Sequence, residues 1–181
     1  FPLIPGHEVV GVVESMGAEV SGLRVGEQVS VNPNIPCGRC AFCRAGRLGL
    51  CQDPRGCGST ATGFFAEFVC VPQALVFSVE GLPVDTAGFT EPAACAMHGV
   101  ETLQVRPGSS ALVLGAGPTG LLLAQLIAAS GASAVTVAGP VPYQLTTATA
   151  LGATSVVPLE RGAPETNQAR LLTASGGEGY D

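Results

Sequence analysis

Four cysteines in the first third of the chain stand close enough together to hold a metal ion. They have C-x2-C-x2-C-x7-C spacing in a loop rich in glycine, proline and arginine, and they are Cys37, Cys40, Cys43 and Cys51. Four thiolates at such spacing can close a tetrahedral shell around Zn²⁺, which leaves no coordination position for a substrate. The spacing therefore predicts a structural zinc site.

Other chemistries also use clustered cysteines. Disulfides suit a secreted chain, but nothing indicates secretion and the cysteine count of seven is odd. An iron-sulfur cluster prefers a fourth cysteine at shorter spacing followed by proline, whereas Gln52 follows Cys51. Nearby arginines would suit a zinc ribbon that binds nucleic acid, but a solvated loop explains them as well, and Phe42 alone offers bases a stacking surface. The other thiols are expected to be buried as small apolar groups: Cys57, Cys70 and Cys95.

A second group of residues could bind a catalytic metal. Gly6-His7-Glu8 opens the first expected strand, and its imidazole and carboxylate form either a metal-binding pair or a satisfied polar turn. Glu91 heads an expected helix, where a carboxylate also interacts favourably with the helix dipole. His98, further along that helix, is expected to be packed or hydrogen-bonded rather than a ligand. Spacing alone leaves the roles of His7, Glu8 and Glu91 open.

The stretch 111–130 has the order strand, turn, helix that is typical of dinucleotide-binding folds. Gly115, Gly117 and Gly120 follow an apolar run in Gly-x-Gly-x-x-Gly spacing. The first glycine permits a sharp turn, the second lets a pyrophosphate approach the backbone, and the third lets the helix pack on the strand. Pro118 and Thr119 begin the helix, whose free N–H groups and dipole favour a phosphate. The pattern predicts dinucleotide binding.

The arrangement of apolar runs predicts an α/β plus β protein with two domains. Residues 1–105 form a β-rich domain, with expected strands at 8–14, 28–31, 64–71 and 75–78 and a helix within 85–101. Residues 106–181 form a doubly wound parallel sheet, with strands at 111–114, 133–138 and 153–158 and helices at 118–130, 142–151 and 167–175. Residues 179–181 resemble the start of a fourth strand, so the chain is expected to be a piece of a longer protein.

Composition bounds the partners and the location. The formal charge is −6 and 46% of residues are hydrophobic, which argues against a nucleic-acid or anionic membrane surface. Residues 107–159 carry no charged side chain, but Gly, Pro, Ser and Thr interrupt them before the ~20 apolar residues of a membrane span accumulate. No leader follows Phe1, so we expect a cytoplasmic protein.

Several of these stretches together resemble the zinc-containing medium-chain dehydrogenases, the superfamily of alcohol and sorbitol dehydrogenases. Residues 5–11 are similar to its Gly-His-Glu signature, and the four cysteines match its structural zinc lobe. Residues 63–68 resemble its Gly-Gly-Phe-Ala-Glu-Tyr strand, and residues 91–100 its Glu-Pro-Leu-Ala-Cys-Ala-Leu-His-Gly-Val helix. The resemblance covers essentially the whole chain and implies a GroES-like domain followed by a Rossmann domain, both partial.

The resemblance implies zinc-assisted hydride transfer between NAD(P) and a secondary alcohol, polyol or sugar-like substrate. In the family a histidine at the position of His7 ligates catalytic zinc, the glutamate at the position of Glu8 is a ligand or lies in the first shell, and the position of Glu91 can supply a further ligand. An upstream cysteine normally completes that set, so the site is expected to be incomplete in this chain, and the piece itself inactive. The resemblance also implies a homodimer or tetramer.

One position departs from the NAD-specific pattern. Gly139 stands near the end of the second Rossmann strand, where an acidic residue would bind the ribose 2'-OH. The absence of an acidic residue removes repulsion toward the 2'-phosphate of NADP. No arginine follows to bind that phosphate, since the next basic residue is Arg161, so NADP is favoured only slightly over NAD. Two other functions are weighed: a zinc-free quinone or enoyl reductase, and a non-catalytic module that binds zinc and nucleotide.

Overall fold

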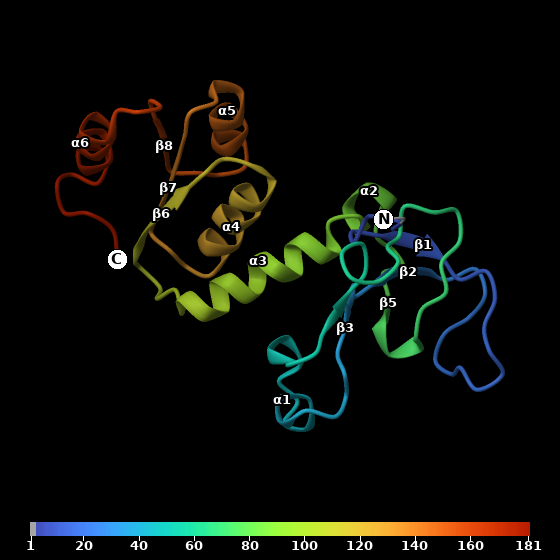
Figure 1. The fold of residues 1–181 in the computed structure, drawn as a ribbon. Helices are drawn as coiled ribbons and strands as arrows, with labels where there is room; N and C mark the ends of the chain where they lie inside the picture. Colours follow the sequence, from blue (N-terminus) through green and yellow to red (C-terminus); the bar gives the residue numbers. More distant parts are fainter. Residues whose placement is uncertain (1–2) are drawn as a thin grey trace. The chain divides into compact units, whose positions relative to one another are not determined.

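The computed structural model describes residues 3–181 and shows two compact units (Figure 1). One ends at Pro92 and the other begins at Ala93, so the division lies within the helix α3 (Thr90–Leu103). The domain boundary expected between residues 105 and 106 lies just beyond this helix and stays a prediction. Each unit has its own hydrophobic core.

The first unit is built on a small antiparallel sheet of order β1-β2-β5. Its strands are β1 (Val10–Val12), β2 (Gln28–Val31) and β5 (Val76–Ser78). A separate pair, β3 (Asn34–Ile35) and β4 (Arg55–Gly56), is also antiparallel. Short helical turns complete the unit: α1 (Ala41–Arg44), η1 (Leu48–Leu50), η2 (Gln73–Leu75) and α2 (Val84–Ala87). Its core gathers side chains from separate stretches, namely Val31, Cys57, Phe64 and Leu75.

The strand expected at residues 64–71 is wrong. The amide N–H of Phe64 donates to Gly6 O at 3.0 Å, but the chain then turns, with Ala66 N–H donating to Phe64 O at 2.7 Å. Phe68 is 74% exposed. Valine and phenylalanine favour strands only where a neighbour completes the hydrogen-bond ladder, and no described strand pairs with this segment.

The second unit is a three-stranded parallel sheet of order β6-β7-β8, and helices connect its successive strands along the chain (Figure 1). Its strands are β6 (Ser110–Leu114), β7 (Ala134–Gly139) and β8 (Ser155–Pro158), and its helices are α4 (Pro118–Ala129), α5 (Pro142–Ala150) and α6 (Pro164–Ala174). Val135 and Val137 on the central strand are 2% and 0% exposed, as expected for a parallel strand covered on both faces. This arrangement confirms the predicted order of strands and helices. Beyond α6, Asp181 N–H donates to Ser110 O at 3.1 Å, beside the start of β6.

Three expectations about burial are corrected by the structure. Cys57 is buried as expected, but Cys70 and Cys95 are exposed. His98 is also exposed rather than packed. The phase of α3 explains two of these positions, because the helix buries Ala96 and Val100 on one face and thereby turns residues 95 and 98 away from it.

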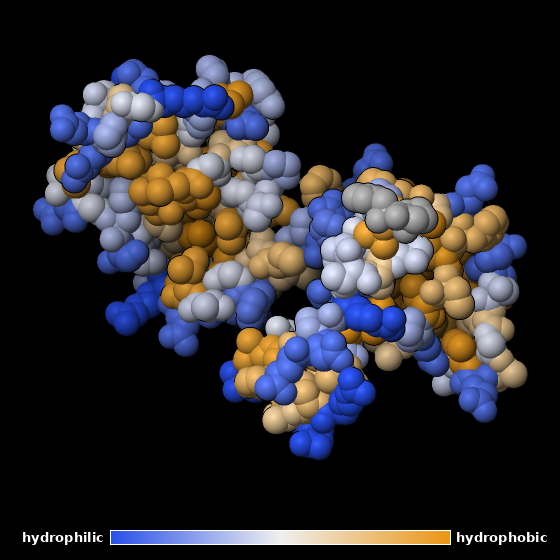
Figure 2. All heavy atoms as spheres, viewed as in Figure 1, coloured by the Kyte–Doolittle hydropathy of each residue, from blue (hydrophilic) through white to orange (hydrophobic). Residues whose placement is uncertain are grey.

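Apolar side chains also lie on the surface of each unit, as the orange spheres of Figure 2 show. The most exposed large ones include Phe65, Phe68, Leu114 and Tyr143. None of the described helices is both long and apolar enough to cross a membrane.

Candidate metal and nucleotide sites

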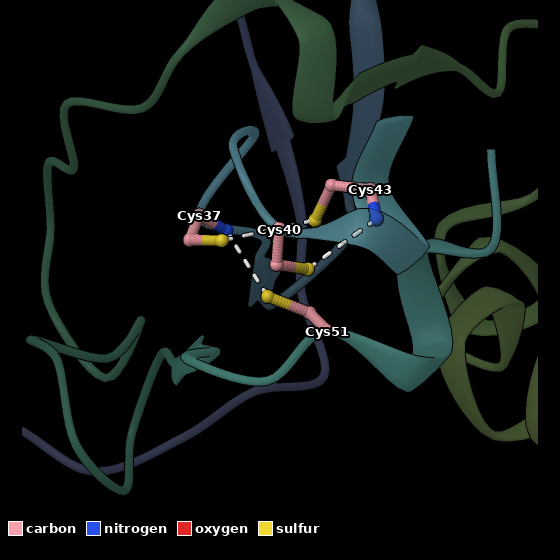
Figure 3. A group of neighbouring side chains, drawn as sticks. All are labelled: Cys37, Cys40, Cys43 and Cys51. Carbon is pink, nitrogen blue, oxygen red and sulfur yellow. Dashed lines mark hydrogen bonds between the residues drawn. The ribbon is translucent and has the colours of Figure 1, made fainter. Parts of the chain in front are cut away.

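The four clustered cysteines converge on one point (Figure 3). Their sulfur atoms all lie within 4.8 Å of one another, and Cys37 Sγ lies 3.9 Å from Cys43 Sγ. Two backbone N–H groups donate to sulfur within the cluster, from Cys37 to Cys51 Sγ at 3.2 Å and from Cys43 to Cys40 Sγ at 3.4 Å. Such bonds orient the sulfurs, so the arrangement suits a tetrahedral Zn²⁺ of the closed structural kind.

Local structure holds the lobe that carries these cysteines. It extends from β3 to β4, whose pairing brings its two ends together. Cys40 is the N-cap of α1, and η1 ends immediately before Cys51. Two arginines of the lobe interact within it: Arg39 Nη2 lies 3.0 Å from Asp53 Oδ2, and the guanidinium of Arg47 lies 5.6 Å from the centre of the Phe42 ring.

The thiols of the cluster differ in acidity. Backbone hydrogen bonds from Gln52 and Cys43 lower the pKa of the Cys40 thiol to about 6. Burial, and then the neighbouring thiols, raise the pKa of the Cys43 thiol to about 12. Because a metal binds thiolates and releases their protons, Zn²⁺ would have to displace the proton of Cys43. Zinc binding to the cluster should therefore weaken as the pH falls.

A second group of ligands lies elsewhere in the first unit. His7, Glu8 and Glu91 each place one donor atom within 4.8 Å of the others, although Glu91 is far from the first two in sequence. The two residues of the N-terminal segment are exposed and Glu91 is half-buried at the start of α3. An imidazole nitrogen with two carboxylate oxygens is a donor set that Zn²⁺ accepts, and three protein ligands leave a position open. The structure thus brings together the three residues whose roles their spacing left open.

The glycine-rich turn has a different backbone requirement at each glycine. Gly115 has φ +113° after β6, and its N–H donates to Ala138 O at 2.8 Å. A Cβ on Gly120 would lie well under 3.0 Å from Gly115 O, so only glycine lets α4 start there. Gly117 is the N-cap of α4, and a Cβ on it would meet no atom within 4 Å. The space beside the Gly117 backbone is therefore open to a ligand.

The end of β7 carries no charge that could select between the two nicotinamide cofactors. Gly139 is buried, and a Cβ there would touch Ala116 of the glycine-rich turn at 3.5 Å. Pro118 and Thr119 form the first turn of α4 beside the same loop. Since residues 107–159 contain no charged side chain, neither an acid for a ribose 2'-OH nor an arginine for a 2'-phosphate comes from that stretch.

Comparison with known proteins shows the family of this chain. The model of the alcohol dehydrogenase GroES-like domain matches residues 1–81. D-arabinitol dehydrogenase 1 of Uromyces fabae is 42% identical over 138 residues, which cover 76% of this chain and 40% of that protein. The chain belongs to the medium-chain dehydrogenases. This confirms the resemblance drawn from the motifs, and with it a GroES-like domain joined to a Rossmann-type sheet.

Two solved medium-chain dehydrogenases have the same fold. A protein from Sinorhizobium meliloti, described as a zinc-binding dehydrogenase and bound to NADP, superimposes with a TM-score of 0.83 at 37% identity, over 87% of this chain and 46% of that one. Galactitol-1-phosphate dehydrogenase from Escherichia coli superimposes with a TM-score of 0.85 at 30% identity, over 96% of this chain and 50% of that one. This medium-chain dehydrogenase chain therefore spans about half the length of the relatives it matches. The four clustered cysteines of this chain could hold a zinc ion, and the Sinorhizobium meliloti relative is described as zinc-binding and bound to NADP.

Sequence reasoning missed two residues beside the second ligand group. Gly58 and Gly63 lie against Gly6, immediately before His7. A glycine in the middle of a loop signals only conformational freedom, and nothing in the spacing indicates which backbone it will touch.

Proposed function

We propose that this chain contributes the zinc-binding and nucleotide-binding elements of a dehydrogenase. The reaction moves a hydride from the carbinol carbon of a secondary alcohol, polyol or sugar-like substrate to NAD(P)⁺, releasing a proton and a carbonyl product. The observation that carries the proposal is the convergence of His7, Glu8 and Glu91 within 4.8 Å in a chain that also has a glycine-rich turn at the start of α4.

The three ligands have separable tasks. His7 would bind through the nitrogen that lies near the carboxylates, and Glu8 and Glu91 would balance the charge of the dication. When bound, zinc supplies a Lewis acid that stabilises negative charge on the alcohol oxygen. The open side of this ligand set is what admits the substrate, in contrast to the closed cysteine cluster, which we assign to structural zinc through Cys37, Cys40, Cys43 and Cys51.

The second unit would hold the cofactor at the start of α4. The N–H groups that follow Gly117 have no partner within the first turn of the helix, and the positive end of the dipole faces the same point. The pyrophosphate would lie there, against Gly115 and Gly117, with Pro118, Thr119 and Gly120 forming the helix start behind it. Gly139 would lie near the adenosine ribose.

Two observations favour a zinc-dependent polyol dehydrogenase over the other functions. The presence of two groups of metal-binding residues disfavours a zinc-free quinone or enoyl reductase. Relatives named for arabinitol and galactitol phosphate support a polyol-type substrate rather than a non-catalytic module. We also infer a homodimer or tetramer, a cytoplasmic location and a domain boundary near residue 105.

Metal analysis tests the proposal directly. The chain should carry two zinc ions, falling to one in Cys37→Ser and separately to one in His7→Ala, with NADH and NADPH binding retained in both variants. Loss of one ion in Cys37→Ser but none in His7→Ala would refute the catalytic site. Light scattering gives the oligomeric state, and a panel of polyols offered to the longer protein with NAD⁺ and NADP⁺ tests the substrate class.

A further inference from the structure

The backbone just before His7 is enclosed by a second stretch of the same unit. A Cβ added to Gly58 would lie 2.5 Å from the carbonyl oxygen of Gly6 and 2.8 Å from its nitrogen. A Cβ added to Gly63 would lie 2.5 Å from the carbonyl oxygens of both Gly6 and Pro5. Real Cβ atoms essentially never approach other atoms below 3.0 Å, so both positions accept only glycine unless the backbone moves.

Hydrogen bonds fix the segment in this position. Gly63 N–H donates to Ile4 O at 2.8 Å, Phe64 N–H to Gly6 O at 3.0 Å and Phe65 N–H to Pro5 O at 3.0 Å. These three bonds determine where the chain leaves Gly6 and hence where the side chain of His7 begins.

Gly58 is held in place just as firmly. Its N–H donates to Ala61 O at 2.8 Å, and the N–H of the preceding Cys57 donates to Pro33 O at 2.9 Å. The Cys57 side chain is 6% exposed and belongs to the core of the first unit. The backbone that touches Gly6 is therefore anchored on one side by this core and on the other by a tight turn.

Such contacts are rare in this chain. Of its 25 glycines, three would bring an added Cβ within 3.0 Å of a backbone atom: Gly58, Gly63 and Gly120. The last shapes the glycine-rich turn, and the other two lie against the same residue, beside a metal ligand of the proposed function. Most of the remaining glycines have open space, so the crowding around Gly6 is local rather than general.

We propose that Gly58 and Gly63 are positioning residues for His7. By fixing the backbone of Gly6 from two sides, they hold the imidazole within reach of the carboxylates of Glu8 and Glu91. This inference rests on the proposed function, since it concerns the metal that these three residues bind. An added methyl group at either glycine shifts Gly6 by on the order of 1 Å, and displacing a group that orients a ligand weakens metal binding roughly 10–100-fold.

Titration of the full chain with Co²⁺ tests the proposal. Thiolate ligands give Co²⁺ an intense charge-transfer absorption, whereas His7 and the carboxylates give only weaker d–d bands, so the two sites are followed separately. Gly58→Ala and Gly63→Ala are the test variants. Gly81→Ala is the control for Gly58→Ala, because Gly81 has φ +84° against +82° but open space around it. Gly17→Ala is the control for Gly63→Ala, because a Cβ at Gly17 makes one ordinary contact at 4.0 Å.

The expected result is selective. Both test variants should keep the thiolate band and bind the second Co²⁺ at least tenfold more weakly, while both controls bind it as the wild type does. Second-site binding as tight as in the controls overturns the inference. A wild-type chain without a second Co²⁺ site, or one that His7→Ala leaves intact, overturns the proposed function instead.

A wild-type measurement covers the case in which neither test variant folds. If the backbone around Gly58 and Gly63 positions His7, binding of the second metal must in turn stabilise that backbone. Hydrogen exchange at the Phe64 and Phe65 amides, which bond to Gly6 and Pro5, should then slow when the second Co²⁺ binds. Exchange that is the same with and without this ion would overturn the positioning role.

Discussion

Gly117 and Gly120, at the start of α4, should have different effects when each is replaced by alanine. The ideal Cβ of Gly120 would overlap Gly115 O, whereas that of Gly117 would meet nothing within 4 Å. Gly120→Ala should therefore damage the fold, and Gly117→Ala should damage only the binding of a ligand. The same chemical change, three positions apart, separates structure from function.

The expected magnitudes follow from the geometry. Overpacking at Gly120 costs up to about 3 kcal/mol, which the better helix propensity of alanine offsets by about 1 kcal/mol. The remaining ~2 kcal/mol corresponds to a loss of roughly 4–8 °C in Tm for a chain of this size. At Gly117, replacing an N-cap glycine costs at most about 1 kcal/mol, or no more than about 4 °C. A methyl group that pushes the pyrophosphate off one charge-assisted hydrogen bond costs roughly 1.5–3 kcal/mol, which is about 10–140-fold in Kd.

Fluorescence titration with NADPH and NADH, together with thermal melting, measures both effects. Gly117→Ala should bind both cofactors at least tenfold more weakly while melting close to the wild-type temperature. Unchanged cofactor affinity in Gly117→Ala would mean that the phosphates do not lie against this backbone. A Gly120→Ala variant that melts with the wild type would show that the contact with Gly115 O relaxes without cost, which would refute the packing argument.

Three further predictions concern stability. Hydrogen bonds from Ser78 and from Arg24 N–H hold the pKa of the Glu27 carboxyl below its usual 4.5. The carboxylate of Glu27 therefore stabilises the folded state above pH 4.5, and this stabilisation is lost as the pH falls through the lower folded-state pKa. Urea unfolding should show Glu27→Gln to be less stable than the wild type at neutral pH, with the two converging in acid; a constant difference would contradict this. Gln104 follows the last residue of α3 and has φ 52°, so Gln104→Gly should raise the free energy of unfolding by about 1 kcal/mol and raise the Tm. An unchanged Tm would contradict strain at this residue. Arg39→Ala removes an exposed ion pair with Asp53, so urea unfolding should show a change of no more than about 1 kcal/mol, and a larger loss would assign the pair a structural role.

The second unit could be predicted almost completely because its signals are local. A parallel strand buried on both faces needs a nearly continuous apolar run, and β7 has one from Ala134 to Ala138. Thr136 interrupts this run, and its hydroxyl is hydrogen-bonded to that of Ser155 at 2.8 Å. The cysteine cluster was equally predictable, since its ligands occupy one short loop and their spacing reflects the shell they form.

Residue type alone was a poor guide where position in an element decides the outcome. Cysteine is buried on average, yet Cys95 is exposed because α3 turns it away from the face that carries Ala96 and Val100. Residues 66–71 have a strand-like composition but no described partner strand. Composition indicates which secondary structure a segment favours. Whether the segment adopts that structure depends on neighbours that come from elsewhere in the chain.

The nucleotide turn and the metal site of His7, Glu8 and Glu91 share a feature that sequence spacing reveals for only one of them. At the nucleotide turn, the glycine that prevents a clash, Gly120, follows its contact Gly115 within one motif, so the pattern itself records the contact. At the metal site the same role falls to Gly58 and Gly63, which reach Gly6 from more than fifty residues away. Because they lie so far from Gly6 in sequence, no short motif with fixed spacing records the contact, although the steric requirement is as strict as at Gly120. Close backbone approach thus supports both candidate sites, and at the metal site only the folded chain shows which glycines provide it.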